Sequence, residues 1–261
     1  MREVVTSLDG ALPAQVGPVD GELIQTLRSH GFDGAPVLDA EEKLIGFVPT
    51  PLLAELAANG QHLAASTPGL WTKVLGAEPT VDELLRFTLD QPAGIVRDEN
   101  GRALGFFTLS DLNRHPVRAA LYPLFAELEA ELAILVGSSF KDPWEWLELV
   151  PKDRRAALVG YWKISERDDV DIGPIAGAML SELGGVVAKH EPLRSKLSFE
   201  SRRQWEETFN GLNEQRHSIM HPVRPLVSNL DDLAKLVERL DKLLDLIGRV
   251  TSATRQPEAA S

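Results

Sequence analysis

An internal repeat in the first half of the chain constrains the fold most strongly. The segment GFDGAPVLDAEEKLIGFVPTPLL (31–53) aligns with DQPAGIVRDENGRALGFFTLSDL (90–112). A single offset of 59 positions places Asp39 on Asp98 and Gly46 on Gly105. Repetition of this kind indicates one supersecondary unit that is present twice.

Each copy is predicted to contain two short strands around an acidic turn, followed by a short helix. An amphipathic helix precedes each copy, at 21–30 and at 80–89. Thr80, followed by two acidic residues, is typical of a helix N-terminus. The strands are predicted at 35–38 and 44–48 in the first copy and at 93–96 and 103–107 in the second.

The second half has helical periodicity throughout. Segment 165–171 is expected to be an exposed loop and the polar tail 251–261 to be disordered. The expected fold class is therefore α+β, with a tandem α/β module at 1–115 and an all-α domain at 116–250. Helices are predicted at 117–136, 151–162, 172–189, 199–221 and 230–250, with a short helix opened by Asp142 and Pro143.

Composition narrows the function classes. The chain has no cysteine, no apolar run that could span a membrane and no visible secretory signal, so a cytoplasmic protein without membrane contact is expected. No cluster has metal-ligand spacing, so no metal is expected. The net charge of −12 disfavours nonspecific nucleic-acid binding. The basic segment 189–203 is either a solvated helix–loop face or a phosphate-contacting surface, and the four tryptophans of this half are expected in the core.

The runs APVLD…LIGF and AGIVRD…ALGFFTLSD, within 15–115, resemble the CBS (cystathionine β-synthase) domain pair. The resemblance implies a cleft between the copies that binds an adenine nucleotide, AMP or ATP, as a regulatory ligand. The family's ligand signature is a Thr or Ser three residues before an Asp, and Thr108 and Asp111 match it. Pro49 and Leu52 occupy these positions in the first copy, so at most one site is expected.

The signature suits a nucleotide chemically. The Asp111 carboxylate can accept hydrogen bonds from ribose hydroxyls, and the Thr108 hydroxyl can meet a phosphate. The base is expected to lie against the strand edge at Gly94, Ile95 and Val96. A purely structural interpretation, compatible with the first, makes Thr108 and Asp111 a helix N-cap with an acidic residue in the first turn.

The segment LNEQRHSIMHP (212–222) contains Arg216, His217 and His221 and resembles the Rx4–6H motif of HEPN domains. The resemblance implies a homodimer in which two such motifs form one cleft that cleaves a selective RNA substrate without a metal. Histidine transfers protons near neutral pH and arginine clamps phosphate oxygens, so the expected product ends are a 2′,3′-cyclic phosphate and a 5′-hydroxyl. Alternatively, these residues stabilise the end of a helix.

Geometry constrains this motif. Five positions on an ideal helix place the Arg216 and His221 side chains about 140° apart, and Pro222 disfavours helical backbone at His221. The sequence therefore favours a nucleotide-sensing module that regulates a HEPN-type endoribonuclease. The alternative is a nonenzymatic nucleotide sensor whose helical domain serves dimerisation and partner docking.

Overall fold

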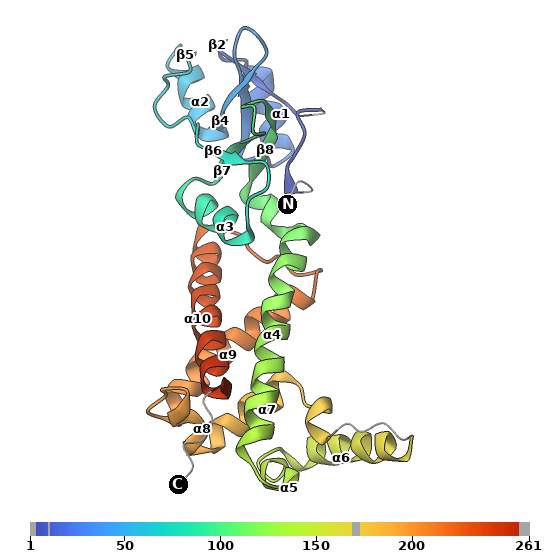
Figure 1. The fold of residues 1–261 in the computed structure, drawn as a ribbon. Coiled ribbons are helices and arrows are strands. Elements are labelled where there is room, and N and C mark those ends of the chain that lie inside the picture. Colours follow the sequence, from blue (N-terminus) through green and yellow to red (C-terminus); the bar gives the residue numbers. More distant parts are fainter. Residues whose placement is uncertain (1–3, 10, 169–172, 256–261) are drawn as a thin grey trace. The chain divides into compact units, whose positions relative to one another are not determined.

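The structure is a computed structural model that describes residues 4–9, 11–168 and 173–255. The chain forms two compact units (Figure 1). The first comprises Met1–Ala120 and Pro225–Val237, and the second comprises Leu121–Arg224 and Glu238–Ser261. The first unit therefore runs past the expected boundary at residue 115 and also includes a segment from late in the chain.

Two three-stranded sheets with the same topology form the centre of the first unit. In each sheet the first two strands are parallel and the last two are antiparallel, with a register shift at the end of the middle strand. This shared topology confirms the predicted repeat. The strands are β1 (Ala14–Gln15), β3 (Gly34–Leu38) and β4 (Leu44–Pro49) in one sheet, and β6 (Val74–Gly76), β7 (Ala93–Arg97) and β8 (Ala103–Thr108) in the other.

Short helices complete each copy. The Thr80 hydroxyl accepts from the Glu83 N–H at 3.2 Å and the Glu83 carboxylate accepts from the Thr80 N–H at 2.8 Å, which confirms the predicted helix start. A small additional sheet pairs β2 (Gly17–Pro18) with β5 (His62–Leu63). The helices are α1 (Gly21–Ser29), α2 (Thr50–Ala58), α3 (Val81–Asp90) and the 3-10 helix η2 (Leu109–Asn113).

The two copies exchange edges, which means that the segment preceding each copy pairs with the last strand of the other copy. Thr6, which precedes the first copy, forms an antiparallel bridge with Phe106 of β8, in the second copy. Trp71, which precedes the second copy, forms the equivalent bridge with Phe47 of β4. Phe47 and Phe106 stand 59 positions apart, the repeat offset. The copies also share one buried cluster, to which β4 contributes Phe47 and β7 contributes Ile95.

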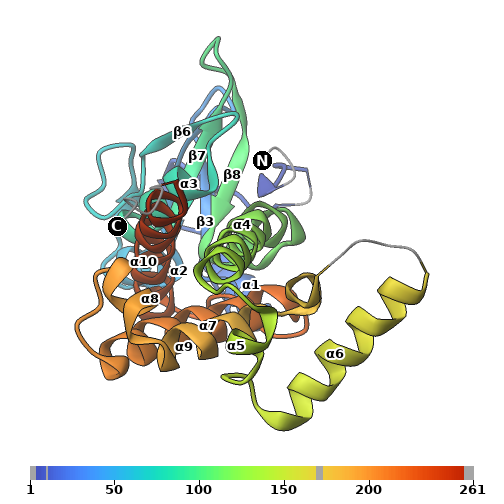
Figure 2. The ribbon, with the colours of Figure 1, turned by 60° about the horizontal axis from the view of Figure 1, so that its bottom comes forward.

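Helices form the second unit, and α7 and α9 lie side by side in it (Figure 2). The close approach depends on Gly184, because a Cβ there would overlap the ring of Phe209. The indole N–H of Trp205 donates to the Gly184 carbonyl at 2.9 Å. The helices are α5 (Pro143–Leu147), α6 (Lys152–Arg167), η3 (Pro174–Gly177), α7 (Leu180–Lys189), α8 (Glu191–Lys196) and α9 (Arg202–Met220). Parts of α4 (His115–Ser139) and α10 (Leu230–Arg255) belong to this unit too.

Two segment predictions are wrong. Helix α7 begins at Leu180 and not at Ile172, which lies outside the described residues, because the Glu182 carboxylate accepts from the Met179 N–H at 2.6 Å and caps the helix there. The predicted loop at 165–171 is helical through Arg167, with Ser165 donating to the Tyr161 carbonyl at 3.1 Å. Residues 169–172 lie outside the described part of the chain.

The tail prediction and one core prediction are also wrong. Residues 251–255 continue α10, where the Ser252 and Thr254 hydroxyls donate to carbonyls one turn earlier at 2.7 and 2.9 Å. Residues 256–261 fall outside the described ranges. Trp146 and Trp205 are buried as expected, whereas Trp162 is half-buried and Trp144 is 45% exposed. Among the helices that the structure describes, none is long and apolar enough to span a membrane.

Candidate functional site

A cavity of about 350 Å³ lies in the first unit, walled by segments of both copies. The N-terminal segment contributes Thr6 and Asp9. The loop before β3 and the strand itself contribute Asp33 and Pro36. Phe106 of β8 and the residues that follow it close the remaining side. The predicted ligand residues Thr108 and Asp111 therefore both line the cavity.

Asp111 is only 5% exposed and sits at the cavity wall. One carboxylate oxygen accepts from the backbone N–H of Thr108 at 2.7 Å and from the Thr108 hydroxyl at 3.1 Å. The other accepts from the Thr6 hydroxyl at 3.1 Å. Asp111 thus lies in the first turn of η2 and accepts from Thr108 at its N-cap, the arrangement of the structural interpretation, and it also lines the cavity.

Arg114 holds this arrangement together. Its guanidinium lies 2.7 Å from the Asp111 carboxylate and donates to the Thr6 hydroxyl at 2.8 Å and to the Val4 carbonyl at 3.3 Å. The N-terminal segment is therefore tied to η2 across more than 100 residues of sequence. Sequence reasoning missed both Thr6 and Arg114, because only the exchange of edges brings Thr6 to the second copy.

Gly94, Ile95 and Val96 do not line this cavity. They belong to β7, which pairs with strands on both sides and therefore has no free edge. A Cβ at Gly94 would lie 2.6 Å from the Phe87 ring, so side chains cover that strand closely. The first copy instead contributes Pro36 to the cavity wall, and Pro36 stands 59 positions before Ile95. This wall could have been found from the sequence: the repeat offset relates each strand residue of the second copy to one of the first copy, and a cleft between the copies is lined by both.

His217 and His221 come together at the end of α9. The helix ends at Met220, and His221 has nonhelical backbone with φ −108° and ψ 87°, as predicted from Pro222. The two imidazole rings are nearly parallel, with their centroids 5.9 Å apart and an 8° interplanar angle, and both side chains are exposed.

Arg216 makes a different contact. Its guanidinium pairs with the Glu129 carboxylate of α4 at 3.5 Å, and the same carboxylate accepts from the Leu180 N–H at 2.8 Å. Glu129 therefore links α4, the first turn of α7 and α9 within the second unit. Nothing in the local sequence around Glu129 indicates this role, because its partners are 51 and 87 positions away.

Most basic side chains of segment 189–203 form hydrogen bonds or ion pairs with groups of the same unit. Lys189 and Arg194 donate to the carbonyls of Leu149 and Ala188, at 2.5 and 2.6 Å. Arg202 and Arg203 each pair with a glutamate one turn later on α9, at 2.7 Å. These contacts are those expected of the solvated helix–loop interpretation.

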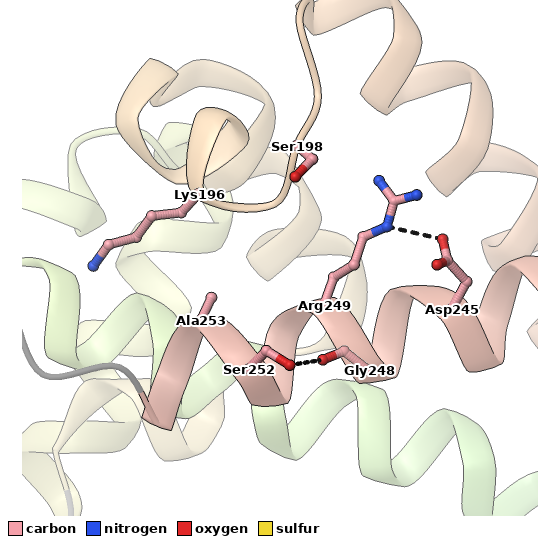
Figure 3. Close-up of a pocket in the computed structure, with 7 residues that line it drawn as sticks. All are labelled: Lys196, Ser198, Asp245, Gly248, Arg249, Ser252 and Ala253. Carbon is pink, nitrogen blue, oxygen red and sulfur yellow. Dashed lines mark hydrogen bonds and ion pairs between the residues drawn. The ribbon is translucent and has the colours of Figure 1, made fainter.

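A second cavity of about 530 Å³ adjoins this segment, between α8 and α10 (Figure 3). Lys196 and Arg249 both line it. Figure 3 shows the Lys196 side chain extending away from Arg249, which instead pairs with Asp245 at 2.9 Å. The two cations therefore do not converge on one point. Across residues 4–9, 11–168 and 173–255, no group of three His, Asp or Glu side chains could hold a metal ion.

No protein-family model matches the chain, and a search of curated proteins gives no match. Its N-terminal part is similar to solved CBS domain structures. One is a CBS domain-containing protein from Bacillus anthracis, 20% identical over 42% of this chain and 87% of that chain, with a TM-score of 0.35. Another is a hemolysin-like protein from Oenococcus oeni, 17% identical over 42% and 85%, with a TM-score of 0.36. A third is the CBS domain of a bacterial CNNM/CorC family Mg²⁺ transporter in complex with ATP, 20% identical over 42% and 82%, also at 0.36.

Proposed function

We propose that the first unit binds an adenine nucleotide in the 350 Å³ cavity and that the chain is a nucleotide sensor. The observation that carries this proposal is the nearly buried Asp111 carboxylate at the cavity wall, beside the hydroxyls of Thr6, Thr108 and Ser110. A carboxylate accepts hydrogen bonds from the two ribose hydroxyls, and hydroxyl groups rotate to donate or accept as the ligand requires. A pocket of this size that combines apolar side chains with convergent polar groups is typical of small-molecule sites.

The apolar part of the cavity suits a flat base. Pro36 and the rings of Phe47 and Phe106 line it, and the two rings lie 5.6 Å apart. An aromatic base placed against them removes apolar surface from water on both partners. The resemblance of the two copies to a CBS domain pair implies that the base is adenine.

Ligand binding to the folded chain tests this proposal. A ligand at one hundred times its Kd adds about 2.7 kcal/mol to the free energy of unfolding, so AMP or ATP should raise the melting temperature. Asp111→Asn should abolish that rise. Asp82→Asn is the matched control, because Asp82 also pairs with an arginine of the same unit, Arg86 at 2.8 Å, but does not line the cavity. Absence of any shift in the wild type, confirmed by calorimetric titration, contradicts nucleotide sensing.

For the second unit we propose metal-independent RNA cleavage, with His217 and His221 as the proton-transfer groups. The exposed, stacked imidazole pair carries this second proposal. One imidazole removes the proton of a ribose 2′-hydroxyl, whose oxygen attacks the adjacent phosphorus. The bond from phosphorus to the 5′-oxygen then breaks, and the second imidazole protonates that oxygen. The products are a 2′,3′-cyclic phosphate and a 5′-hydroxyl.

Arg216 and a second copy of the chain complete this proposal. In this proposal Arg216 leaves the Glu129 carboxylate and binds the RNA phosphate, because a guanidinium group binds carboxylates and phosphates alike through paired donors. Two apolar side chains beside the histidines, Met220 and Val223, are 44% and 92% exposed. A second copy packed against them would bring two motifs together and remove this apolar surface from water.

Incubation of the full chain with a mixed RNA pool in EDTA tests the cleavage proposal. Wild type should produce cyclic-phosphate ends, and His217→Ala or His221→Ala should abolish them without lowering the melting temperature. His62→Ala, which removes an exposed imidazole from the first unit, is the control and should cleave normally. If wild type leaves the RNA intact with and without AMP or ATP, the nonenzymatic sensor, with a helical unit for dimerisation and partner docking, is the better description.

A further inference from the structure

We infer that the Asp111 cavity selects ligands of low negative charge, a nucleoside or a nucleoside monophosphate, and discriminates against triphosphates. This inference rests on the proposed nucleotide binding and adds the property by which the ligand is chosen. It assigns the discrimination to two residues that neither the repeat nor the ligand signature singles out, Asp9 and Asp33.

The charges that line the cavity are unbalanced. Among the described residues of the wall, the charged side chains are Asp9, Asp33, Asp111 and Arg114. Arg114 pairs with Asp111 at 2.7 Å, so that cation already balances one carboxylate. The other two carboxylates, of Asp9 and Asp33, have no matching positive charge among the wall residues that the structure describes. The cavity therefore presents a net negative potential to an entering ligand.

Asp9 and Asp33 are both exposed, and they come from different segments. Asp9 accepts a hydrogen bond from the Ser7 hydroxyl at 3.1 Å, an exposed contact that leaves its charge in place. Asp33 lies in the loop before β3, next to Gly34, which also lines the cavity. No ion pair joins either carboxylate to another described side chain.

The physical consequence concerns the phosphates. A monophosphate carries about two negative charges at pH 7, and each further phosphate adds to them. Sites that bind phosphate chains usually offer several arginine or lysine donors. Among its described residues, this wall offers Arg114 as its one cation, together with hydroxyl groups. Like charges in a partly enclosed cavity repel more strongly than in bulk water, so each added phosphate should weaken binding.

A bridging Mg²⁺ between two aspartates and a triphosphate would reverse this result. The described residues contain no group of three acidic or histidine side chains that could hold a metal. The experiment separates repulsion from such bridging by including Mg²⁺.

Calorimetric titration of the full chain with adenosine, AMP, ADP and ATP, each in EDTA and in Mg²⁺, tests the inference. In EDTA at low salt, adenosine or AMP should bind at least tenfold more tightly than ATP. Higher salt should narrow the difference, because it screens exposed carboxylates. The double variant Asp9→Asn, Asp33→Asn should tighten ATP binding severalfold more than AMP binding. Each single variant should give part of that effect.

The control variant is Glu41→Gln, Glu99→Gln. It removes the same net charge from exposed turns of the same unit that do not line the cavity, and it should leave the preference unchanged. Equal affinity for ATP and AMP in EDTA overturns the inference while nucleotide binding stands. So does ATP binding that needs Mg²⁺ and is lost in the Asp9→Asn, Asp33→Asn variant. If no ligand binds the wild type, nucleotide sensing itself fails, which is a distinct result.

Discussion

Asp111 and Arg114 form an ion pair of 2.7 Å in which the carboxylate side chain is 6% exposed and the guanidinium side chain 41% exposed. This ion pair has two structural roles. It caps the turn after β8, and it orients the carboxylate that faces the cavity. The same guanidinium reaches Thr6, so the N-terminal segment depends on this pair as well.

The pair should behave as a coupled unit. Replacing Arg114 by Gln leaves the nearly buried Asp111 carboxylate without its cation, and we expect a loss of about 1–3 kcal/mol in the free energy of unfolding. Combining Arg114→Gln with Asp111→Asn should cost less than the sum of the two single changes, by about 1 kcal/mol. Urea denaturation of the four proteins measures this difference. Strict additivity would show that the two side chains do not stabilise each other.

The two repeat glycines should respond unequally to alanine. Gly105 has a φ of +153°, and a Cβ there would overlap the carbonyl oxygen of Thr6. Gly105→Ala should therefore destabilise the first unit by about 1–3 kcal/mol and weaken ligand binding, because Thr6 lines the cavity. At the matching position Gly46, the nearest atom to a Cβ is in the Leu70 side chain, 2.9 Å away, which can rotate aside. Thermal unfolding should show a smaller loss for Gly46→Ala, and equal losses would contradict the closer approach of the Thr6 backbone to Gly105.

Two adjacent glycines of α7 give a matched pair in the second unit. At Gly184 a Cβ would overlap the Phe209 ring, so Gly184→Ala should cost about 1–3 kcal/mol of unfolding free energy. At Gly185 a Cβ meets nothing within 4 Å, so Gly185→Ala should be neutral or stabilising, by up to about 1 kcal/mol, because alanine favours helix. Chemical denaturation checks the sign of each change. Stabilisation by Gly184→Ala would rule out the close packing of α7 on α9.

His190 should make stability pH-dependent. Burial lowers the pKa of His190 below its ordinary value, and the positive charge of Arg194 lowers it further. The folded chain therefore binds this proton less readily than the unfolded chain. The stability is complete above a pH of about 6.5 and is lost as the pH falls from there toward the lower pKa of the folded state.

Melting temperatures at pH 8 and pH 5.5 test this dependence. His190→Asn should lose less stability than wild type between these pH values, because asparagine does not titrate. His62→Asn, at an exposed position, should keep the pH dependence of the wild type. A His190→Asn protein with the same pH dependence as the wild type would contradict the assignment.

Local patterns accounted for much of this molecule. The 59-residue offset predicted two copies with the same strand order, and the sheets have it. The cap at Thr80 and the helix end before Pro222 follow from side chains within a few positions of each other. These features are predictable because hydrogen bonds of caps and the periodicity of apolar residues act over one or two turns of chain.

Pairings between distant residues were not predictable in the same way. Arg216 was expected to act in one site with the histidines, but its partner Glu129 is 87 positions away on another helix. Trp144 was expected in the core with the other tryptophans, yet it is 45% exposed, and the buried residues of that short helix are Trp146 and Leu147. Whether one face of a short helix is buried depends on which other helix packs against it, and the local sequence pattern does not specify that helix.

The sequence by itself determined the α+β class, the repeat, the helical character of the second half and the positions of Thr108, Asp111 and the two histidines. Only the tertiary structure decided which wall faces Asp111. The two copies exchange edges, so Thr6 contacts Asp111 directly and Pro36 of the first copy lines the same cavity, whereas Ile95 lies on a strand that is paired on both sides. The physical reason is that strand pairing satisfies backbone hydrogen bonds between whichever segments meet, and their order along the chain does not fix that choice.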